Sequence, residues 1–130
     1  MRTRHRVRQV LNAVNLTTPL GLAVGRVGGA RFARGPDGLV VGSGYRLGFP
    51  VARAFTLGNA VVARTPLPGD SRLMVHEARH ATQYAFLGLL LLPAYGVAAL
   101  WSKARTGDWA SANVFERQAG LADGGYPDRR

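Results

Sequence analysis

The uncharged run from Tyr84 to Trp101 limits what this 130-residue chain can fold into more than any other feature. The run has 18 residues, and no charged residue occurs between His80 and Lys103. A stretch of that length and composition must be considered as a membrane span. Pro93 lies near its middle, and proline inside a helix breaks or kinks it. The run therefore either crosses a bilayer as one rod or turns at Pro93 into a helical hairpin.

An H-E-x-x-H pattern, His76-Glu77-Ala78-Arg79-His80, stands directly before this run. Residues four apart share one face of a helix, so His76 and His80 can offer two imidazoles to one metal ion. Glu77 would lie beside them to accept a proton, as in the helix signature of zinc metallopeptidases. The chain has three histidines and only two glutamates. The second glutamate, Glu116, lies downstream, where a third ligand is needed.

The apolar run and the candidate metal site restrict each other. A straight span would hold His80 and Glu116 at opposite faces of the hydrocarbon core, about 30 Å apart, where they cannot share a metal ion. A helix that ends near Pro93 travels about 18 Å from His80, and a second helix over residues 94–105 returns about the same distance. We therefore predict the hairpin, with Glu116 brought level with the histidines.

Two segments carry a resemblance to a known family. His76-Glu77-Ala78-Arg79-His80-Ala81-Thr82-Gln83-Tyr84 and Asn113-Val114-Phe115-Glu116-Arg117-Gln118-Ala119 resemble the small bacterial DUF4157-like metallopeptidases. In that group an H-E-x-x-H helix with a trailing Gln is followed by a helix with an F-E-R-x-A or L-E-R-E-A pattern. The resemblance covers roughly residues 56 to 126.

The resemblance implies a zincin of the glutamate-ligand kind. His76, His80 and Glu116 would hold Zn²⁺, and Glu77 would act as general base. Members of the group often carry an acidic residue four positions after the glutamate ligand, where it supports a histidine. This chain has Gly120 at that position, which is a departure from the pattern.

Other roles for the acidic residues near the C-terminus stay open. Asn113-Val114-Phe115-Glu116 has the spacing of a capping box, in which the glutamate side chain merely satisfies a backbone donor. Asp123 shares the helical face of Glu116 and is a candidate partner for a ligand histidine. The donor to a reaction oxyanion stays unassigned among Tyr84, Tyr95, Tyr126 and the arginines.

The rest of the chain predicts a single α+β domain. Residues 1–16 form a basic amphipathic helix, from Arg4 to Asn15, whose apolar stripe is expected to pack on the domain rather than lie on a membrane. Residues 17–69 are punctuated by Gly and Pro and predict a small antiparallel sheet, whose edge is a candidate site for an extended peptide. Residues 70–123 form the helical metal-site region, and residues 124–130 an irregular, exposed tail.

The boundaries of the individual elements follow from local signals. Short apolar runs between turn residues predict three strands, and capping residues mark the starts of the helices. The strands are expected over 20–27, 38–47 and 54–64, and the helix with the histidines over 72–92, capped by Asp70 or Ser71. The last helix is expected to begin after Ser111 or Asn113 and to end at Ala122.

Composition narrows the classes of partner. The net charge is +10, with one lysine against 16 arginines, but beyond residue 8 these are scattered and do not alternate with aromatic residues. We therefore expect no specific nucleic-acid binding. Cysteine is absent, which excludes disulfides and a thiolate zinc site. The residues after Arg8 are too polar for a signal peptide, so a cytoplasmic protein is expected. Membrane contact through the 84–101 hairpin and oligomerisation stay open.

Three functions are consistent with these patterns. The first is a zinc-dependent hydrolase, above all a metallopeptidase, acting on an extended peptide or a small molecule. The second is a non-catalytic domain that zinc stabilises and that docks to a partner or a membrane. The third is a basic single-span membrane protein in which the H-E-x-x-H is a chance match.

Overall fold

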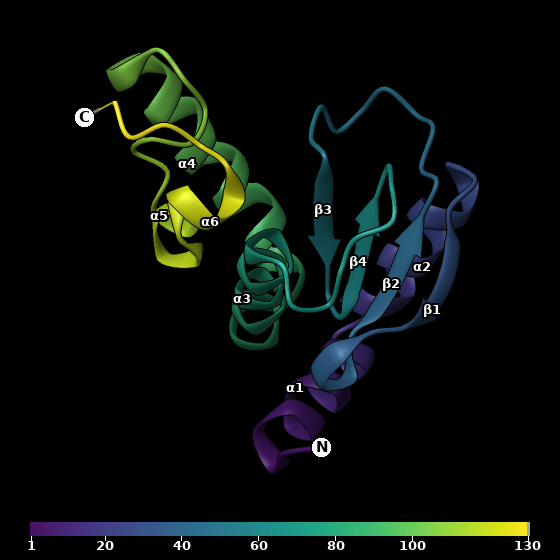
Figure 1. Ribbon diagram of the computed structural model, residues 1–130. Coiled ribbons are helices and arrows are strands. Elements are labelled where there is room, and N and C mark those ends of the chain that lie inside the picture. The colour runs from purple at the N-terminus through teal and green to yellow at the C-terminus, as the bar shows by residue number, and fades with distance from the viewer. Residues whose placement is uncertain (130) are drawn as a thin grey trace.

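The computed structural model describes residues 1–129 and has the predicted α+β fold, in which helices surround a small sheet (Figure 1). The helices are α1 (Thr3–Val14), α2 (Thr17–Val27), α3 (Arg72–Leu87), α4 (Leu91–Thr106), α5 (Val114–Ala119) and α6 (Leu121–Gly124), with short 3-10 turns η1 (Pro36–Gly38) and η2 (Gly88–Leu90). The strands are β1 (Arg31–Arg34), β2 (Val40–Ser43), β3 (Ala54–Leu57) and β4 (Ala60–Ala63).

The sheet is mixed, with strand order β1-β2-β4-β3. β1 and β2 pair antiparallel, as do β3 and β4, but β2 and β4 run parallel. The prediction of an antiparallel sheet is therefore wrong for its central pair. The strand expected over 54–64 is in fact the β3–β4 hairpin. It turns at Gly58-Asn59 because Gly58, with a φ of 64°, supplies the backbone conformation of a two-residue turn.

The strand predicted over 20–27 is wrong, because this segment is the helix α2. Gly21 and Gly25, which suggest strand punctuation in the sequence, lie four apart on the helix face that meets the sheet. A Cβ atom on Gly21 would lie 2.5 Å from the carbonyl oxygen of Leu57, and one on Gly25 would lie 2.4 Å from the Phe32 ring. The two glycines therefore let α2 approach the sheet closely.

The central strand β4 is buried on both faces. Val61 packs with Leu39, Met74 and Ala81 on the side of α3, whereas the adjacent Val62 packs on the side of α2. Both valines are fully buried. Side chains alternate between the faces of a strand, so this pair of contacts places α3 and α2 on opposite sides of the sheet.

Helix α1 forms where predicted but packs with the opposite face. Asn12 is fully buried and Arg8 nearly so, whereas Val10 is 54% exposed and Val14 is 75% exposed. The buried polar side chains donate to backbone carbonyls of α3: Arg8 to Ala78 at 3.2 Å, Asn12 to Ala81 at 3.0 Å, and Asn15 to Tyr84 at 3.0 Å. The carbonyl groups of α3 that accept these hydrogen bonds therefore determine which face of α1 is buried. This face is not the one that the apolar periodicity predicts.

The apolar run is interrupted at Gly88 and not, as predicted, at Pro93. Gly88 has a φ of 59°, which ends α3 and leads through η2 into α4. Pro93 is the third residue of α4, where the missing N–H has no partner inside the helix to lose. The chain also returns to the histidines by a different route from the predicted one, in which the second helix itself leads back. Helix α4 extends away from the sheet, and the segment after Thr106 leads back to α5 (Figure 1).

The packing of α1 predicts an unequal response to two substitutions. Asn12→Ala removes donors to Ala81 and to Asn59 Oδ1, 2.6 Å away, in a fully buried position. The free energy of unfolding should fall by about 1–3 kcal/mol. Val10→Ala, two residues away on the exposed side, should change it by less than about 0.5 kcal/mol. Urea denaturation monitored by circular dichroism measures both, and a larger effect at Val10 would contradict this packing.

Candidate metal centre

The two histidines stand one turn apart, in the second and third turns of α3. Ser71 caps this helix, because its Oγ accepts from the backbone N–H of Met74 at 3.1 Å. This settles the choice between Asp70 and Ser71. From this start, His76 and His80 lie on one face of α3, and both are buried, with 1% and 8% of their surface exposed.

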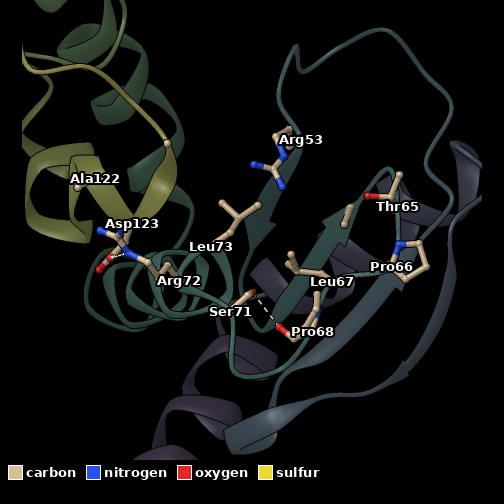
Figure 2. Close-up of a pocket in the computed structure, with 12 residues that line it drawn as sticks. Arg53, Thr65, Pro66, Leu67, Pro68, Ser71, Arg72, Leu73, Ala122 and Asp123 are labelled. Atoms are coloured by element: carbon tan, nitrogen blue, oxygen red, sulfur yellow. Dashed lines mark hydrogen bonds and ion pairs between the residues drawn. The ribbon is translucent and has the colours of Figure 1, made fainter.

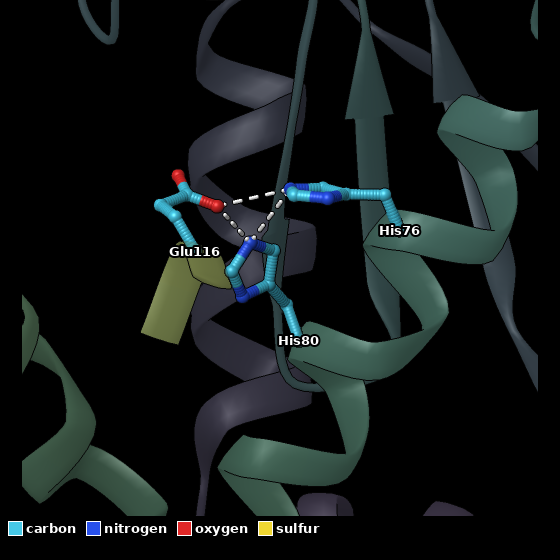
Figure 3. A group of neighbouring side chains, drawn as sticks. All are labelled: His76, His80 and Glu116. Carbon is cyan, nitrogen blue, oxygen red and sulfur yellow. Dashed lines mark hydrogen bonds and ion pairs between the residues drawn. The ribbon is translucent and has the colours of Figure 1, made fainter. Parts of the chain in front are cut away.

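Glu116 meets the two histidines at one point, as the sequence predicts. Its Oε1 lies 2.9 Å from His76 Nε2 and 2.7 Å from His80 Nε2, and the two nitrogens are 3.1 Å apart (Figure 3). A point on either side of their plane can lie about 2.0–2.2 Å from all three atoms, which are the lengths of zinc–nitrogen and zinc–oxygen bonds. The three side chains can therefore hold a metal ion.

The other ring nitrogens fix which atoms face this point. His76 Nδ1 lies 2.8 Å from the carbonyl oxygen of Gly120, and His80 Nδ1 lies 2.8 Å from Gln83 Oε1. Both partners are acceptors, so each Nδ1 carries the proton. Nε2 is therefore the nitrogen of each imidazole that faces Glu116 Oε1 and is available to a metal ion when it carries no proton. Three electron-pair donors in contact require a proton or a metal cation between them.

Glu116 is positioned by a cap and by a tyrosine. Asn113 is the N-cap of α5, since its Oδ1 accepts from the backbone N–H groups of Phe115 and Glu116, whereas its own N–H donates to Ala110. The capping-box alternative for Glu116 is therefore wrong. Its Oε2 accepts a hydrogen bond from the Tyr95 hydroxyl, which comes from α4. This leaves Oε1 alone to face the histidines.

The charge state of Glu116 follows from its neighbours. Burial by itself raises the pKa of this carboxyl, but the hydrogen bonds with His76 and His80 outweigh burial and hold the pKa well below its usual range. For His80, burial lowers the pKa, and the contact with Glu116 raises it above the ordinary value. Glu116 is therefore an anion at neutral pH, which favours a bound cation.

The absent acidic residue at position 120 is replaced by a backbone group. The carbonyl of Gly120 accepts the His76 Nδ1 proton, which is the role that a carboxylate plays in the related pattern. Gly120 has a φ of 100°, and a Cβ there would lie 2.7 Å from Arg79 Nη1. His76 is therefore oriented by the main chain of Gly120, without an acidic side chain at this position.

Gln83 orients the second histidine and was not assigned a role from the sequence. Its Nε2 donates to the carbonyl of Phe115 and to Gln118 Oε1, both at 2.9 Å. These two bonds fix the amide so that Oε1 faces His80. The signal for this role was the spacing, because Gln83 follows His80 by three residues and shares its helical face.

Asp123 lies elsewhere than predicted. Its carboxylate pairs with Arg72 at 2.8 Å and with Arg79 at 3.0 Å, and neither ligand histidine is its partner. These hydrogen bonds lower the pKa of Asp123. Asp123 therefore ties α6 to α3. It affects the metal centre only through Arg79, which also donates to the carbonyl of Ala119.

Glu77 lies beside the ligands with one oxygen unpaired. The side chain is 3% exposed, and its Oε2 has no hydrogen-bond partner. Burial raises the pKa of this carboxyl to about 7, against the attraction of His80 and His76. A buried carboxylate without a partner is costly, so it indicates a proton or a ligand at this position.

The structure distinguishes the three candidate tyrosines. Tyr84 is buried in a core cluster with Leu57 and Leu91, and the Tyr95 hydroxyl is used by Glu116. The Tyr126 ring lies 5.8 Å from the His76 ring and is half-buried. Residues 125–129 are irregular and mostly exposed, whereas Gly124 still belongs to α6 and Tyr126 packs on the metal site.

A groove of about 370 Å³ opens beside the N-terminal end of α3 (Figure 2). Its walls come from the end of the β3–β4 hairpin, the segment 65–68, α3 and α6. Leu73 lines it one turn before His76 and Glu77, and Gly125 lines it next to Tyr126. The groove therefore lies about one helical turn before the metal centre, and none of the three candidate ligands lines it.

The contact between Tyr95 and Glu116 predicts a change in metal affinity. Tyr95→Phe keeps the ring but removes the hydroxyl that holds Oε2, so zinc affinity should fall about 10–100-fold. Tyr45→Phe is the matched control, because that hydroxyl donates to the Phe49 carbonyl instead. Competition with a chromophoric chelator measures both affinities. Equal affinities in Tyr95→Phe and the parent protein would show that Glu116 needs no support from α4.

In comparisons with known proteins, no family model, no curated protein and no solved structure matches this chain. The membership suggested by the two motifs therefore stays a prediction, and function is inferred from the arrangement of the side chains.

Proposed function

We propose that this protein is a zinc-dependent hydrolase, and specifically a metallopeptidase. The observation that carries the proposal is the unpaired, buried oxygen of Glu77 beside three convergent metal ligands. A protein that merely needs a metal for stability has no use for a second buried carboxylate there. Two imidazoles and one carboxylate are also the ligand set of catalytic zinc sites that keep a position for water.

The metal site and the residues around it have separate roles in the proposed hydrolysis. Zinc bound at this site would supply a Lewis acid that activates water for attack on a carbonyl. Glu77 accepts the proton of the attacking water and passes it to the leaving amine. Tyr126 is the tyrosine whose ring lies against His76 without serving the core, and its hydroxyl is assigned as the donor to the oxyanion.

The surroundings of the centre favour an extended peptide as the substrate. The groove lies beside α3 one turn before the ligands, and β3, the outer strand of the sheet, lies next to α3. A peptide laid along this side would use the main-chain groups of an edge strand, as strand-adding ligands do. Arg53 and Arg72 line the groove and favour acidic side chains or a carboxylate in the bound segment.

A second function is supported by burial. His76, Glu77 and Glu116 are each no more than 3% exposed, which is typical of a metal that joins two elements of a fold. In that case the ion fastens α5 to α3 and raises stability without turnover. The two functions differ in what they require of Glu77.

Metal analysis of three variants tests the proposal. The purified protein should contain one equivalent of zinc, and His80→Ala should lose it. His5→Ala is the matched control, because His5 lies on α1, where it pairs with Asp37 of η1. This variant should leave the zinc content unchanged. Glu77→Gln should keep the metal and the melting temperature but lose cleavage of an unfolded protein substrate, measured by mass spectrometry of the products.

The outcomes separate the two functions. Full zinc content with identical, zinc-dependent unfolding in wild type and Glu77→Gln, and no products from either, would favour the stabilising role. Chelation should then lower the melting temperature. Retention of zinc by His80→Ala would overturn both functions, because the metal would be bound elsewhere.

A further inference from the structure

Helix α4 is apolar around its whole circumference but is covered on one side only. Leu91 and Ser102 are buried, and Tyr95 on the same side reaches Glu116. The other side exposes Val97, Leu100 and Trp101, each by more than half of its surface. A helix that is apolar all round is normally buried on all sides. The outer side of α4 therefore lacks a cover within the residues 1–129.

The uncovered surface continues across the junction with α3. Phe86 is 86% exposed and Leu90 is 71% exposed, with Leu87, Leu89 and Leu92 partly exposed beside them. Single exposed apolar residues are ordinary, but so many exposed apolar side chains between positions 86 and 101 mark an interaction surface. We call these residues, together with Val97, Leu100 and Trp101, the α4 surface.

The charged residues of α4 and of its junction with α3 are all of one sign. Residues 78–107 contain Arg79, Lys103 and Arg105 and no acidic residue. Lys103 and Arg105 lie in the last turn of α4, directly after Trp101, and the Arg105 guanidinium lies 5.8 Å from the centre of the Trp101 ring. Tryptophan followed by cations at the end of an apolar stretch is typical of the interface between lipid headgroups and hydrocarbon.

From this combination we propose that the α4 surface binds an anionic phospholipid bilayer. The apolar side chains enter the acyl boundary, and Lys103 and Arg105 contact the headgroup phosphates. A second copy of the chain fits less well, because it would bring the same cations to the interface and no acidic partner from this region. This proposal does not depend on whether the metal centre hydrolyses a substrate.

The bound state is a surface contact and not a crossing. The helical stretch Arg72–Thr106 is long and apolar enough to span a membrane, and 11% of its most apolar 18-residue window is buried. However, α3 holds His76, Glu77 and His80 against the sheet and α5, so this half is already packed inside the domain. Only α4 and the junction are free to meet lipid.

Vesicle sedimentation with matched variants tests the proposal. The zinc-loaded protein should sediment with vesicles of phosphatidylcholine and phosphatidylglycerol, should not do so with phosphatidylcholine alone, and should dissociate as salt rises. Phe86→Ser with Val97→Ser should weaken binding by at least about tenfold. Phe49→Ser with Val51→Ser is the control, because these residues are 82% and 92% exposed on a different segment. It should bind like the parent.

A second pair of variants tests the charge. Lys103→Gln with Arg105→Gln should weaken binding to the anionic vesicles, whereas Arg31→Gln with Arg34→Gln, on β1 at the outer edge of the sheet, should have a smaller effect. Circular dichroism checks that each variant is folded. Equal effects from both pairs would overturn the assignment of the site to α4, since attraction would then come from overall charge.

Tryptophan fluorescence places the contact. The Trp109→Phe variant leaves Trp101 as the one tryptophan, and its emission should shift to the blue and be quenched by brominated anionic lipid. Three results would overturn the proposal: no shift, a dimer in lipid-free solution that Phe86→Ser with Val97→Ser dissociates, or a protein that alkaline carbonate cannot extract from membranes. The last two would identify a second copy or a true span as the cover.

Discussion

Two imidazole lone pairs and one carboxylate oxygen meet at a single point, and the fold has to tolerate that repulsion or neutralise it with a cation. The Nδ1 protons of His76 and His80 are committed to Gly120 and Gln83, so they cannot provide the positive charge at that point. Glu116 is kept ionised by the same contacts. A metal ion at this point would resolve the conflict and would at once join α3 to α5.

Much of the remaining structure serves to hold α3 in place. Helix α1 supports it with polar side chains that donate to its carbonyls, which fixes its position along the axis more sharply than apolar packing does. On the other side of the sheet, α2 comes close enough through Gly21 and Gly25 to bury β4 completely. The histidines are thus carried by a helix that is fixed from two directions, as a preorganised site requires.

The sequence predicted the centre better than its scaffold. His76, His80 and Glu116 are recognisable because the spacing of residues on a helix is fixed, and because glutamate is rare in this chain. The predicted packing of α1 was wrong because periodicity considers apolar residues alone. It does not show that Arg8 and Asn12 can donate hydrogen bonds to the carbonyl groups of another helix. Gly21 and Gly25 lie in a segment predicted as a strand, since the close approach of a helix to the sheet is a tertiary property that local patterns do not show. Gly88 rather than Pro93 ends α3 because a positive φ stops a helix, whereas proline in a first turn does not.

Helix α4 touches both the centre and the outside. Tyr95 on its inner side fixes one oxygen of Glu116, and its outer side is the one that lacks a cover. Any occupant that shifts or steadies α4 therefore alters how firmly that carboxylate is held. By thermodynamic linkage, binding of the metal ion must change the affinity of the outer side of α4 for its occupant by the same factor. The hydrogen bond from the Tyr95 hydroxyl to Glu116 is the direct connection between metal binding and binding at the outer side of α4.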